Sequence, residues 1–468
     1  MCNRLRTRRP LVVLAALLLA CSPHGPLAAQ GGRAGLVSAL DSIARAALKD
    51  GRAAGLSVGV VKGRDTLLLK GYGYADLEFD VPTPDRASYE IGSVTKQFTA
   101  AAILQLVEQG KLSLDDDLSK YLPDYPEQGH RIPIRRLMDH TSGIKGYTEM
   151  PDFRDFAMRK LPRDSLVARF SKAPFDFAPG AALVYNNSGY FLLGLIIEKV
   201  SGKPYAEYVA ANLFARAGMP DSRYCSENAV VKRRAHGYDV DTAGKLVRAA
   251  YLDHTWPFAA GSLCSTTGDL IAWTRALHGG KILGPQAYRE LITPDTLNDG
   301  TRLRYAKGLA VSPVAGHRAL HHSGGINGFL SDLAWFPDDS AIIVVLVNTA
   351  GPVNPGGILS AMAERLLGKR EPAPGRPIAG DLAEFAGAWR GLGRGNPLVL
   401  RTSVDSAGLS FQAQGPGAGP GQRRRLRRLS ADSFAAGETL LTFLREGGRV
   451  VKLRFDEVSI VSTLDRQP

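Results

Sequence analysis

Residues 91–123 read IGSVTKQFTAAAILQLVEQGKLSLDDDLSKYLP, and this stretch indicates the fold more clearly than any other. It places Ser93 and Lys96 three residues apart at the start of an apolar, helix-favouring run, QFTAAAILQLVEQG. Residues at this spacing share one face of a helix. A Lys held beside a Ser hydroxyl in a partly dry site can lose its proton and help to activate the Ser. Taken alone, the tetrad leaves open that Ser93 is only an N-cap.

The same Ser-x-x-Lys spacing occurs a second time, from Ser142 to Lys145. Those residues belong to HTSGIKGY, where Gly143 and Gly146 make a stable helix unfavourable. We therefore expect the first tetrad, and not the second, to carry chemistry.

A second motif is Tyr185-Asn186-Asn187, which precedes the apolar run SGYFLLGLIIEKVSG. A Tyr can act as a general base if neighbouring cations lower its pKa. The amide of Asn187 can donate to a substrate carbonyl and can also bind a Lys side chain. Without the other motifs, a half-buried ring with a satisfied hydroxyl would be the simpler interpretation of Tyr185.

A third motif, HSGGINGF, begins at His322. A Gly-rich strand edge lets a substrate backbone approach closely, and a free backbone N–H there could complete an oxyanion hole. No HExxH run is present that would make His321 and His322 part of such a metal site, and no GxSxG nucleophile elbow is present. We therefore expect neither a metal nor a cofactor.

The ordered motifs Ser-x-x-Lys, Tyr-x-Asn and His-x-Gly resemble those of the serine β-lactamase and penicillin-binding-protein superfamily. The flanking stretches LMDHTSGI (137–144) and YNNSGYFLLGLIIEKVSGKPY (185–205) narrow the resemblance to class C β-lactamase-like serine hydrolases. That group includes esterases, D-aminopeptidases and DD-carboxypeptidases. The resemblance covers residues 34–370 and implies an antiparallel sheet flanked by helices, with an all-helical subdomain.

The resemblance also implies roles for individual residues. Ser93 would be the nucleophile that forms an acyl-enzyme, and Lys96 would be its proton partner. Tyr185 would be the general base of acylation and would activate water in deacylation. The stretch from His140 to Gly143 is expected to be structural. The substrate-binding and oxyanion residues implied by the resemblance are Asn187, His322, Ser323, Gly324 and Gly325.

Within that set, Asn187 would orient the substrate amide or ester. The backbone N–H groups of Ser93 and Gly325 would form the oxyanion hole, while His322 and Ser323 would line the far side of the substrate.

One departure from the family pattern bears on the substrate, because many members have Lys where His322 stands. A Lys is cationic and binds a substrate carboxylate, whereas a His of pKa about 6.5 is mostly neutral at pH 7. β-Lactams and D-Ala-D-Ala peptides both carry that carboxylate. We therefore expect hydrolysis of an ester or amide bond in a small-molecule or peptide substrate. The alternatives are a true class C-type β-lactamase or DD-carboxypeptidase, and, outside the enzymes, a non-catalytic penicillin-recognising envelope receptor.

The pattern along residues 34–370 also indicates an α+β fold. Helical spacing over 35–50 precedes two strand-like runs, 55–63 and 65–75, and a mostly helical section extends from about 93 to 280. Three further strands are expected within 319–350, followed by a helix over 357–367. The order of strands, helices and strands predicts one sheet that combines both ends of the unit.

A Pro-rich linker, 371–380, separates this unit from residues 381–468. Short alternating runs between Gly-rich turns predict a small all-β, barrel-like domain there. Related hydrolases often carry such a barrel, which in some cases reaches toward the active site. The cluster RRRLRR (423–428) favours a solvated hairpin over a contact with anionic lipid or glycan.

The chain has 468 residues, of which 44% are hydrophobic and 22% are charged. These values are typical of a globular protein and exclude disorder, collagen and coiled coil for most of its length. The net charge is +13, but much of the excess comes from RRRLRR and from a second arginine cluster within the first ten residues. The charge therefore does not indicate a nucleic-acid-binding face.

The first 29 residues resemble a secretion signal, because an Arg-rich start precedes the apolar run LVVLAALLLA (11–20). Ten apolar residues are too few to span a bilayer. LLAC (18–21) resembles a lipobox that would place a lipid anchor on Cys21, whereas cleavage after Ala29 would leave no lipid. Either reading predicts export to the periplasm or cell envelope.

Two cysteines lie in the body of the chain, Cys225 and Cys264. In an exported protein such a pair predicts one disulfide. Two buried free thiols are the alternative.

Overall fold

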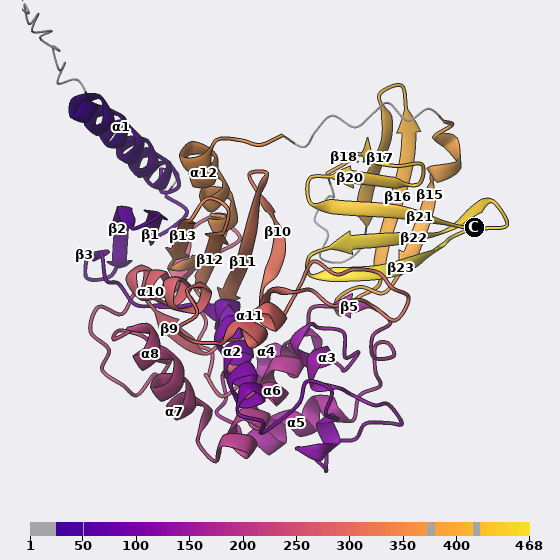
Figure 1. Ribbon diagram of the computed structural model, residues 1–468, viewed down its shortest axis with the longest axis horizontal. Coiled ribbons are helices and arrows are strands. Elements are labelled where there is room, and N and C mark those ends of the chain that lie inside the picture. Colours follow the sequence, from indigo (N-terminus) through magenta and orange to yellow (C-terminus); the bar gives the residue numbers. More distant parts are fainter. Residues whose placement is uncertain (1–24, 50, 372–379, 415–421) are drawn as a thin grey trace, which may run out of the picture.

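The computed structural model describes residues 25–49, 51–371, 380–414 and 422–468 (Figure 1). Most of the expected signal segment, with Cys21 and its lipobox, lies outside the described residues, as does most of the expected linker 371–380. Within the described ranges, no helix is both long and apolar enough to cross a membrane.

A seven-stranded antiparallel sheet joins both ends of the first 370 residues, as the sequence predicts. All residues of its strand 341–347 are buried, and this strand pairs with neighbours on both sides. A strand covered on both faces must be apolar throughout, which explains the sequence AIIVVLV. In spatial order the strands are β10 (Ala310–Val314), β11 (His317–Ile326), β12 (Phe329–Phe336), β13 (Ala341–Val347), β1 (Gly55–Lys62), β2 (Asp65–Asp76) and β3 (Val81–Pro82).

Two helices, α1 (Gly25–Ala46) and α12 (Pro355–Leu367), cover one face of this sheet (Figure 1). They pack on each other and on β2, β12 and β13, with Leu40 and Met362 fully buried between helices and sheet. The helix expected over 35–50 is present, but it begins earlier, at Gly25, and ends at Ala46.

The opposite face is covered by a helical subdomain that packs around α2 (Thr95–Glu108). Most residues of α2 are buried, including polar ones such as Lys96 and Gln97, so this helix forms the centre of the subdomain. The neighbouring helices α6 (Asn187–Ser201), α9 (Phe258–Gly261) and α11 (Pro285–Ile292) contact it directly. The other helices of this unit are α3 (Ile134–Met138), α4 (Phe153–Phe156), α5 (Arg163–Ser171), α7 (Tyr205–Val209), α8 (Ala215–Ala217) and α10 (Thr267–His278).

The disulfide Cys225–Cys264 is present, with an S–S distance of 2.03 Å, so the predicted pairing is confirmed.

Short turns and small sheets complete the unit. The helical turns are η1 (Gly92–Val94), η2 (Leu118–Lys120), η3 (Tyr147–Glu149) and the π-helical η4 (Ala210–Phe214). The small sheets, in spatial order, are β4 (Tyr89–Glu90), β9 (Leu263–Ser265), β6 (Arg223–Tyr224), and β14 (Thr349–Ala350), β7 (Tyr238–Val240), β8 (Leu246–Arg248).

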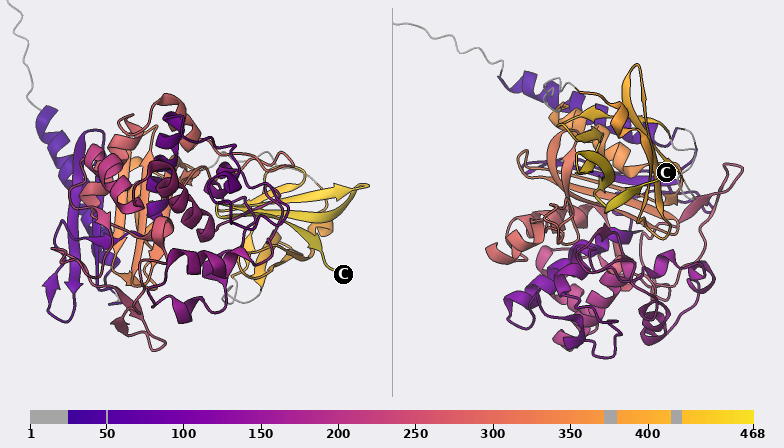
Figure 2. Two further views of the ribbon diagram at one scale, coloured as in Figure 1. Left: turned by 90° about the horizontal axis from the view of Figure 1, so that it is seen from below. Right: turned by 90° about the vertical axis from the view of Figure 1, so that its right-hand side faces the viewer.

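The C-terminal residues form a nearly closed antiparallel barrel with its own apolar core (Figure 2). The two ends of its strand order are separated in sequence by Leu426 alone, so the sheet curls back on itself. The predicted barrel-like domain is confirmed. Its short helical turn is η5 (Ala383–Phe385), and its strands, in spatial order, are β18 (Arg424–Arg425), β17 (Gly408–Gln414), β16 (Leu398–Asp405), β15 (Gly387–Gly391), β23 (Ile460–Arg466), β22 (Arg449–Glu457), β21 (Thr439–Glu446), β20 (Ser433–Ala436) and β19 (Arg427–Arg428).

The arginine cluster forms this seam and not the expected hairpin, because β18 pairs with β17 while β19 pairs with β20. Arg423 and Arg425 both form ion pairs with Asp405. Two arginines of the cluster therefore share one carboxylate within the barrel.

The barrel docks beside the helical subdomain through a shared strand pairing. Strand β5 (Leu183–Val184) pairs with β23, with Val184 opposite Ile460. Two ion pairs cross the same interface, Arg304 with Asp456 and Arg454 with Asp299. Because β5 directly precedes Tyr185, the barrel lies next to a predicted site residue.

Candidate active site

Ser93 and Lys96 meet at the start of the buried helix. Ser93 lies in the turn η1, and Lys96 lies in the first turn of α2 with its side chain 0% exposed. The Lys96 Nζ lies 3.1 Å from Ser93 Oγ, 2.8 Å from Asn187 Oδ1 and 2.8 Å from the carbonyl oxygen of Ala260. The structure thus brings together three residues that the motifs single out.

The protonation state of Lys96 follows from these neighbours. Burial lowers the pKa of Lys96 well below its ordinary value, and Arg394 lowers it further, while Glu149 opposes the shift. A neutral amine has two N–H donors and one lone pair. The Asn187 and Ala260 oxygens can only accept, so they take both donors. The lone pair is then left for the Ser93 hydroxyl, which is the arrangement a proton acceptor requires.

Tyr185 lies beside this pair with its ring buried. Its hydroxyl has no hydrogen-bond partner of good geometry among the described residues, although the nearby Ser93 hydroxyl acts to lower its pKa. Lys96 Nζ and Arg394 Cζ lie 4.8 and 5.1 Å from the ring centroid. Burial outweighs the neighbouring groups and raises the pKa of Tyr185. The condition set by the sequence analysis, a pKa lowered by cations, is therefore not met in this state, and Tyr185 holds its proton.

The loop after α3 contacts the backbone of the Tyr-x-Asn motif. His140 Nδ1 accepts a hydrogen bond from the Asn186 N–H at 3.1 Å, and its ring lies 4.2 Å from that of Tyr185. Burial lowers the pKa of His140 well below its ordinary value, so the ring stays neutral. This contact agrees with a structural function for His140, directly behind Tyr185.

Asn187 begins α6, and the side chain of the preceding Asn186 caps that helix by accepting from Gly189 N–H at 2.9 Å. Asn187 accepts from Lys96 and donates through Nδ2 to Thr148 Oγ1 at 3.1 Å. Its amide is therefore held at both ends, with one Nδ2 proton remaining for a substrate carbonyl.

The Gly-rich end of β11 packs directly on the turn that carries Ser93. A Cβ on Gly324 would lie 2.2 Å from the Ile91 carbonyl oxygen, and a Cβ on Gly92, whose φ is +49°, would lie 2.8 Å from Gly325 N. A side chain on either Gly92 or Gly324 would therefore clash with the neighbouring backbone. The close approach places the Ser93 and Gly325 backbones side by side, as an oxyanion hole requires.

Strand β11 also leaves an unpaired edge beside the site. It pairs with β10 only as far as His321, whereas it pairs with β12 through Ile326. The main chain from His322 onward is therefore available on one side to an extended substrate.

His322 is a neutral, hydrogen-bonded side chain beside Tyr185. Its Nδ1 donates to the Ser323 carbonyl oxygen at 2.5 Å, so its Nε2 accepts from the Tyr305 hydroxyl at 2.9 Å. Burial lowers the pKa of His322 to about 3. His322 therefore does not supply the positive charge that a Lys would provide there, while Ser323 is exposed.

The comparisons with known proteins agree with this geometry. The family model described as Beta-lactamase matches residues 40–366. The chain belongs to the beta-lactamase family. Penicillin-binding protein 4* of Bacillus subtilis is 30% identical over 336 residues, which cover 68% of this chain and 73% of that protein. Protein flp of Staphylococcus aureus is 28% identical over 319 residues, which cover 66% of this chain and 62% of flp, less than two thirds of its length.

Solved structures extend the likeness of this beta-lactamase family member. The octameric penicillin-binding protein homologue from Pyrococcus abyssi has a TM-score of 0.62 and 26% identity, and covers 92% of this chain and 98% of its own. That share includes much of the barrel. A D-stereospecific amidohydrolase from Streptomyces sp. has a TM-score of 0.62 and 25% identity, and covers 71% of this chain and 98% of its own.

The structure adds residues that the motifs did not predict. Thr148 and Glu149 lie on η3, and Arg394 comes from the barrel loop between β15 and β16. Arg394 forms an ion pair with Glu149 beside Tyr185. No pattern in the sequence links these segments; only the resemblance, which implies that such barrels reach toward the site in some relatives, pointed in this direction.

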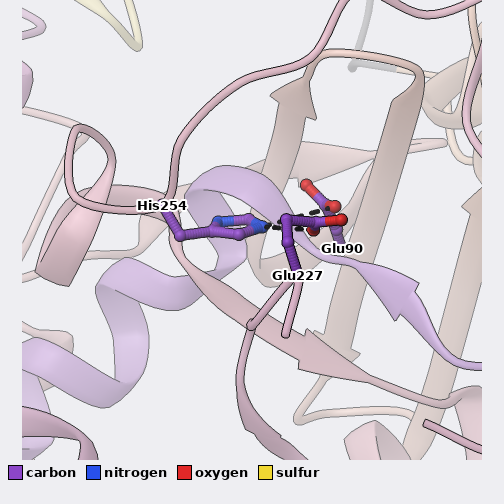
Figure 3. A group of neighbouring side chains, drawn as sticks. All are labelled: Glu90, Glu227 and His254. Atoms are coloured by element: carbon purple, nitrogen blue, oxygen red, sulfur yellow. Dashed lines mark ion pairs between the residues drawn. The ribbon is translucent and has the colours of Figure 1, made fainter. Parts of the chain in front are cut away.

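A second group of charged side chains comprises Glu90, on the strand β4 that leads toward Ser93, together with Glu227 and His254 (Figure 3). His254 Nε2 lies 3.4 Å from Glu90 and 3.6 Å from Glu227, and the three side chains are close enough to hold a metal ion. Burial alone would lower the pKa of His254, but the two carboxylates raise it to about 9. A protonated imidazole between two carboxylates accounts for this group without an ion.

Proposed function

We propose that this beta-lactamase family member is a serine hydrolase that cleaves an ester or amide bond through an acyl-Ser93 intermediate. The observation that carries the proposal is the buried Lys96 amine, whose two donors are taken by oxygen acceptors and whose third contact is Ser93 Oγ.

In acylation, Lys96 takes the proton from Ser93 Oγ as this oxygen attacks the substrate carbonyl. The backbone N–H groups of Ser93 and Gly325 stabilise the negative charge on the carbonyl oxygen. Tyr185, which holds its proton in the resting site, donates it to the leaving amine or alkoxide. The acyl-enzyme then contains a tyrosinate beside a protonated Lys96.

In deacylation, the Tyr185 oxygen takes a proton from water, and the resulting hydroxide attacks the acyl carbonyl. Lys96 returns its proton to Ser93 Oγ as that oxygen leaves. Each group ends in its starting state, so the cycle needs only its substrate and water.

The substrate is proposed to be an ester or a peptide-like amide without an obligatory carboxylate at the His322 position. The neutral His322 supports this choice, and the free edge of β11 suits an extended main chain. The amidohydrolase likeness supports an amide of a D-amino acid. The neutral His322 disfavours the alternatives, a class C-type β-lactamase and a DD-carboxypeptidase.

We propose in addition that the protein is exported and works in the periplasm or cell envelope. The signal-like residues 1–29 support export, and LLAC at 18–21 supports membrane anchoring through a lipid on Cys21. The mass of the mature N-terminus distinguishes a lipid on Cys21 from cleavage after Ala29. An intact Met1 on the mature protein would contradict export.

A hydrolysis panel tests the activity. It contains a p-nitrophenyl short-chain ester, a D-amino acid amide, a chromogenic cephalosporin and a D-Ala-D-Ala peptide, with Ser93→Ala measured beside the wild type. Turnover of the ester or amide that Ser93→Ala abolishes is the expected result. Turnover confined to the cephalosporin or to the D-Ala-D-Ala peptide would favour an alternative enzyme. No turnover and no covalent adduct on Ser93 would contradict the hydrolase and support the receptor.

A further inference from the structure

The barrel reaches the active site through the loop that joins β15 to β16. Gly395 of this loop, with a φ of +73°, lies so close to η3 that a Cβ would come within 3.0 Å of Glu149 Cβ. The neighbouring Arg394 places its guanidinium 5.1 Å from the centre of the Tyr185 ring. The loop therefore contacts the site through its backbone and through one cation.

A continuous set of hydrogen bonds connects this cation to the Tyr-x-Asn motif. Arg394 Nε donates to Glu149 Oε1 at 2.6 Å, and Thr148 Oγ1 donates to the same oxygen at 2.8 Å. Thr148 Oγ1 in turn accepts from Asn187 Nδ2 at 3.1 Å, and Asn187 Oδ1 accepts from Lys96. The position of Asn187 thus depends on a side chain of the other domain.

The barrel also holds the backbone of this motif. The Tyr185 N–H donates to the Ser459 carbonyl oxygen at 2.9 Å, and β5, directly before it, pairs with β23. Both Tyr185 and Asn187 are therefore positioned from the barrel, one through its main chain and the other through Arg394.

The charges that face Lys96 and Tyr185 are few. Burial lowers the pKa of His322 to about 3 and that of His140 well below its ordinary value, so both rings are neutral at pH 7. Burial likewise raises the pKa of Tyr190 and Tyr305 well above the ordinary value of a tyrosine, so both hydroxyls keep their protons. The charged pair that remains beside Lys96 is Glu149 and Arg394, which act on its pKa in opposite directions.

The balance within that pair depends on Arg394. The Glu149 side chain is 13% exposed and the Arg394 side chain is 44% exposed. Without Arg394, the more buried carboxylate would act on Lys96 alone and would favour the protonated amine, which cannot accept the Ser93 proton.

We propose that Arg394 is a positioning residue of the catalytic site, supplied by the barrel, that holds Asn187 through Glu149 and Thr148 and compensates the charge of Glu149 beside Lys96. This inference rests on the proposed function, because it assigns Arg394 to the same acyl-Ser93 chemistry. On this proposal, the barrel contributes a positioning side chain to the active site.

The test compares Arg394→Gln with the wild type in the full chain. We measure kcat and KM across pH with the substrate that is turned over, together with the rate at which a fluorophosphonate probe labels Ser93. We expect kcat to fall by roughly tenfold with a smaller change in KM. We expect the acidic limb of both profiles to move to higher pH, because the pKa of Lys96 rises when the cation is removed.

Two further variants separate charge from geometry. Arg394→Lys keeps a positive charge but loses the planar fork, so the acidic limb should return while kcat recovers only in part. The double variant Arg394→Gln with Glu149→Gln removes the uncompensated carboxylate and should also restore the acidic limb.

Arg454→Gln is the matched control, because it breaks an ion pair with Asp299 across the same interface without touching the site. Its kcat and pH profile should equal those of the wild type. If Arg394→Gln matches this control, the inference is wrong, although Ser93-dependent turnover stands. If the wild type shows neither turnover nor labelling of Ser93, the proposed function fails and the inference fails with it.

Discussion

Lys96 and Lys307 are both fully buried, and the comparison between them separates a lysine proposed to act as a base from a structural one. Lys307 Nζ lies 3.3 Å from Glu290 and 3.1 Å from Asp295, and donates to the Thr293 carbonyl oxygen. Lys96 contacts only uncharged oxygens. A buried ammonium persists where carboxylates compensate it, and otherwise the group releases its proton. Because both lysines are buried, the difference between them lies in the groups that each side chain contacts.

The largest expected effect comes from replacing Lys96 with a side chain that stays positively charged. Lys96→Arg cannot act as a base, because a guanidinium keeps its proton. We expect kcat/KM to fall by at least about a thousandfold. Lys307→Arg is the control, since its carboxylates tolerate a cation, and its activity should stay within about threefold of the wild type. Comparable turnover in the two variants would remove the distinction between the lysines.

Removing the second lysine tests the structural half of the comparison. Lys307→Met leaves the carboxylates of Glu290 and Asp295 without their buried partner, although Arg135 still lies 3.3 and 3.5 Å from them. We expect the free energy of unfolding to fall by about 2–3 kcal/mol. Urea unfolding measures the change, and an unaltered midpoint would contradict the assigned role.

His254 extends the comparison to a third buried base, since it too lies between carboxylates. Its pKa is raised to about 9 in the folded protein, above an ordinary value of about 6.5. Its stabilisation is therefore complete below pH 6.5 and is lost as the pH rises through 9. We expect His254→Gln to lower the free energy of unfolding by about 1–2 kcal/mol at pH 6 and by much less at pH 9.5.

The control for this variant is His236→Gln, because His236 pairs with Asp76 in a more exposed position. Its effect on unfolding should be smaller. An effect of His254→Gln that did not change between pH 6 and 9.5 would show that the ion pair is not its source.

The smallest expected effect has the opposite sign. Lys96→Met removes a buried amine that has no charged partner, so stability should rise by about 1 kcal/mol at pH 7 while activity is lost. Thermal unfolding of Lys96→Met and Lys307→Met, measured side by side, tests the comparison directly, because the two substitutions should change stability in opposite directions. Destabilisation by both substitutions would contradict it.

The sequence predicted the parts of the site that are local in the chain. Ser93 and Lys96 lie at one helix start, so their spacing alone places them together. Asn187 likewise begins its helix, directly after the capping Asn186. The all-apolar run of β13 likewise identified a strand flanked on both sides. These predictions succeed because their physical causes act over a few residues.

The remaining features depend on segments that only the folded chain brings together. Arg394 and Glu149 are 245 positions apart, and nothing in either segment indicates the other. The sequence left open whether cations lower the pKa of Tyr185, because residue types show which cations are present but not how deeply a ring is buried. The arginine cluster 423–428 does not form the expected hairpin, because its two short strands pair with different neighbours, β17 and β20. These pairings depend on how the whole barrel closes, which the local sequence does not show.

The pairing of β5 with β23 has a consequence for the order in which the molecule matures. The two strands come from the middle of the chain and from residues 460–466, so the backbone that presents Tyr185 cannot be fixed until both have been synthesised. Contacts between such distant segments form late in folding. A nascent or partly folded chain would therefore carry Ser93 beside Lys96 but would hold Tyr185 loosely, and the proposed hydrolysis would begin only once β23 has docked.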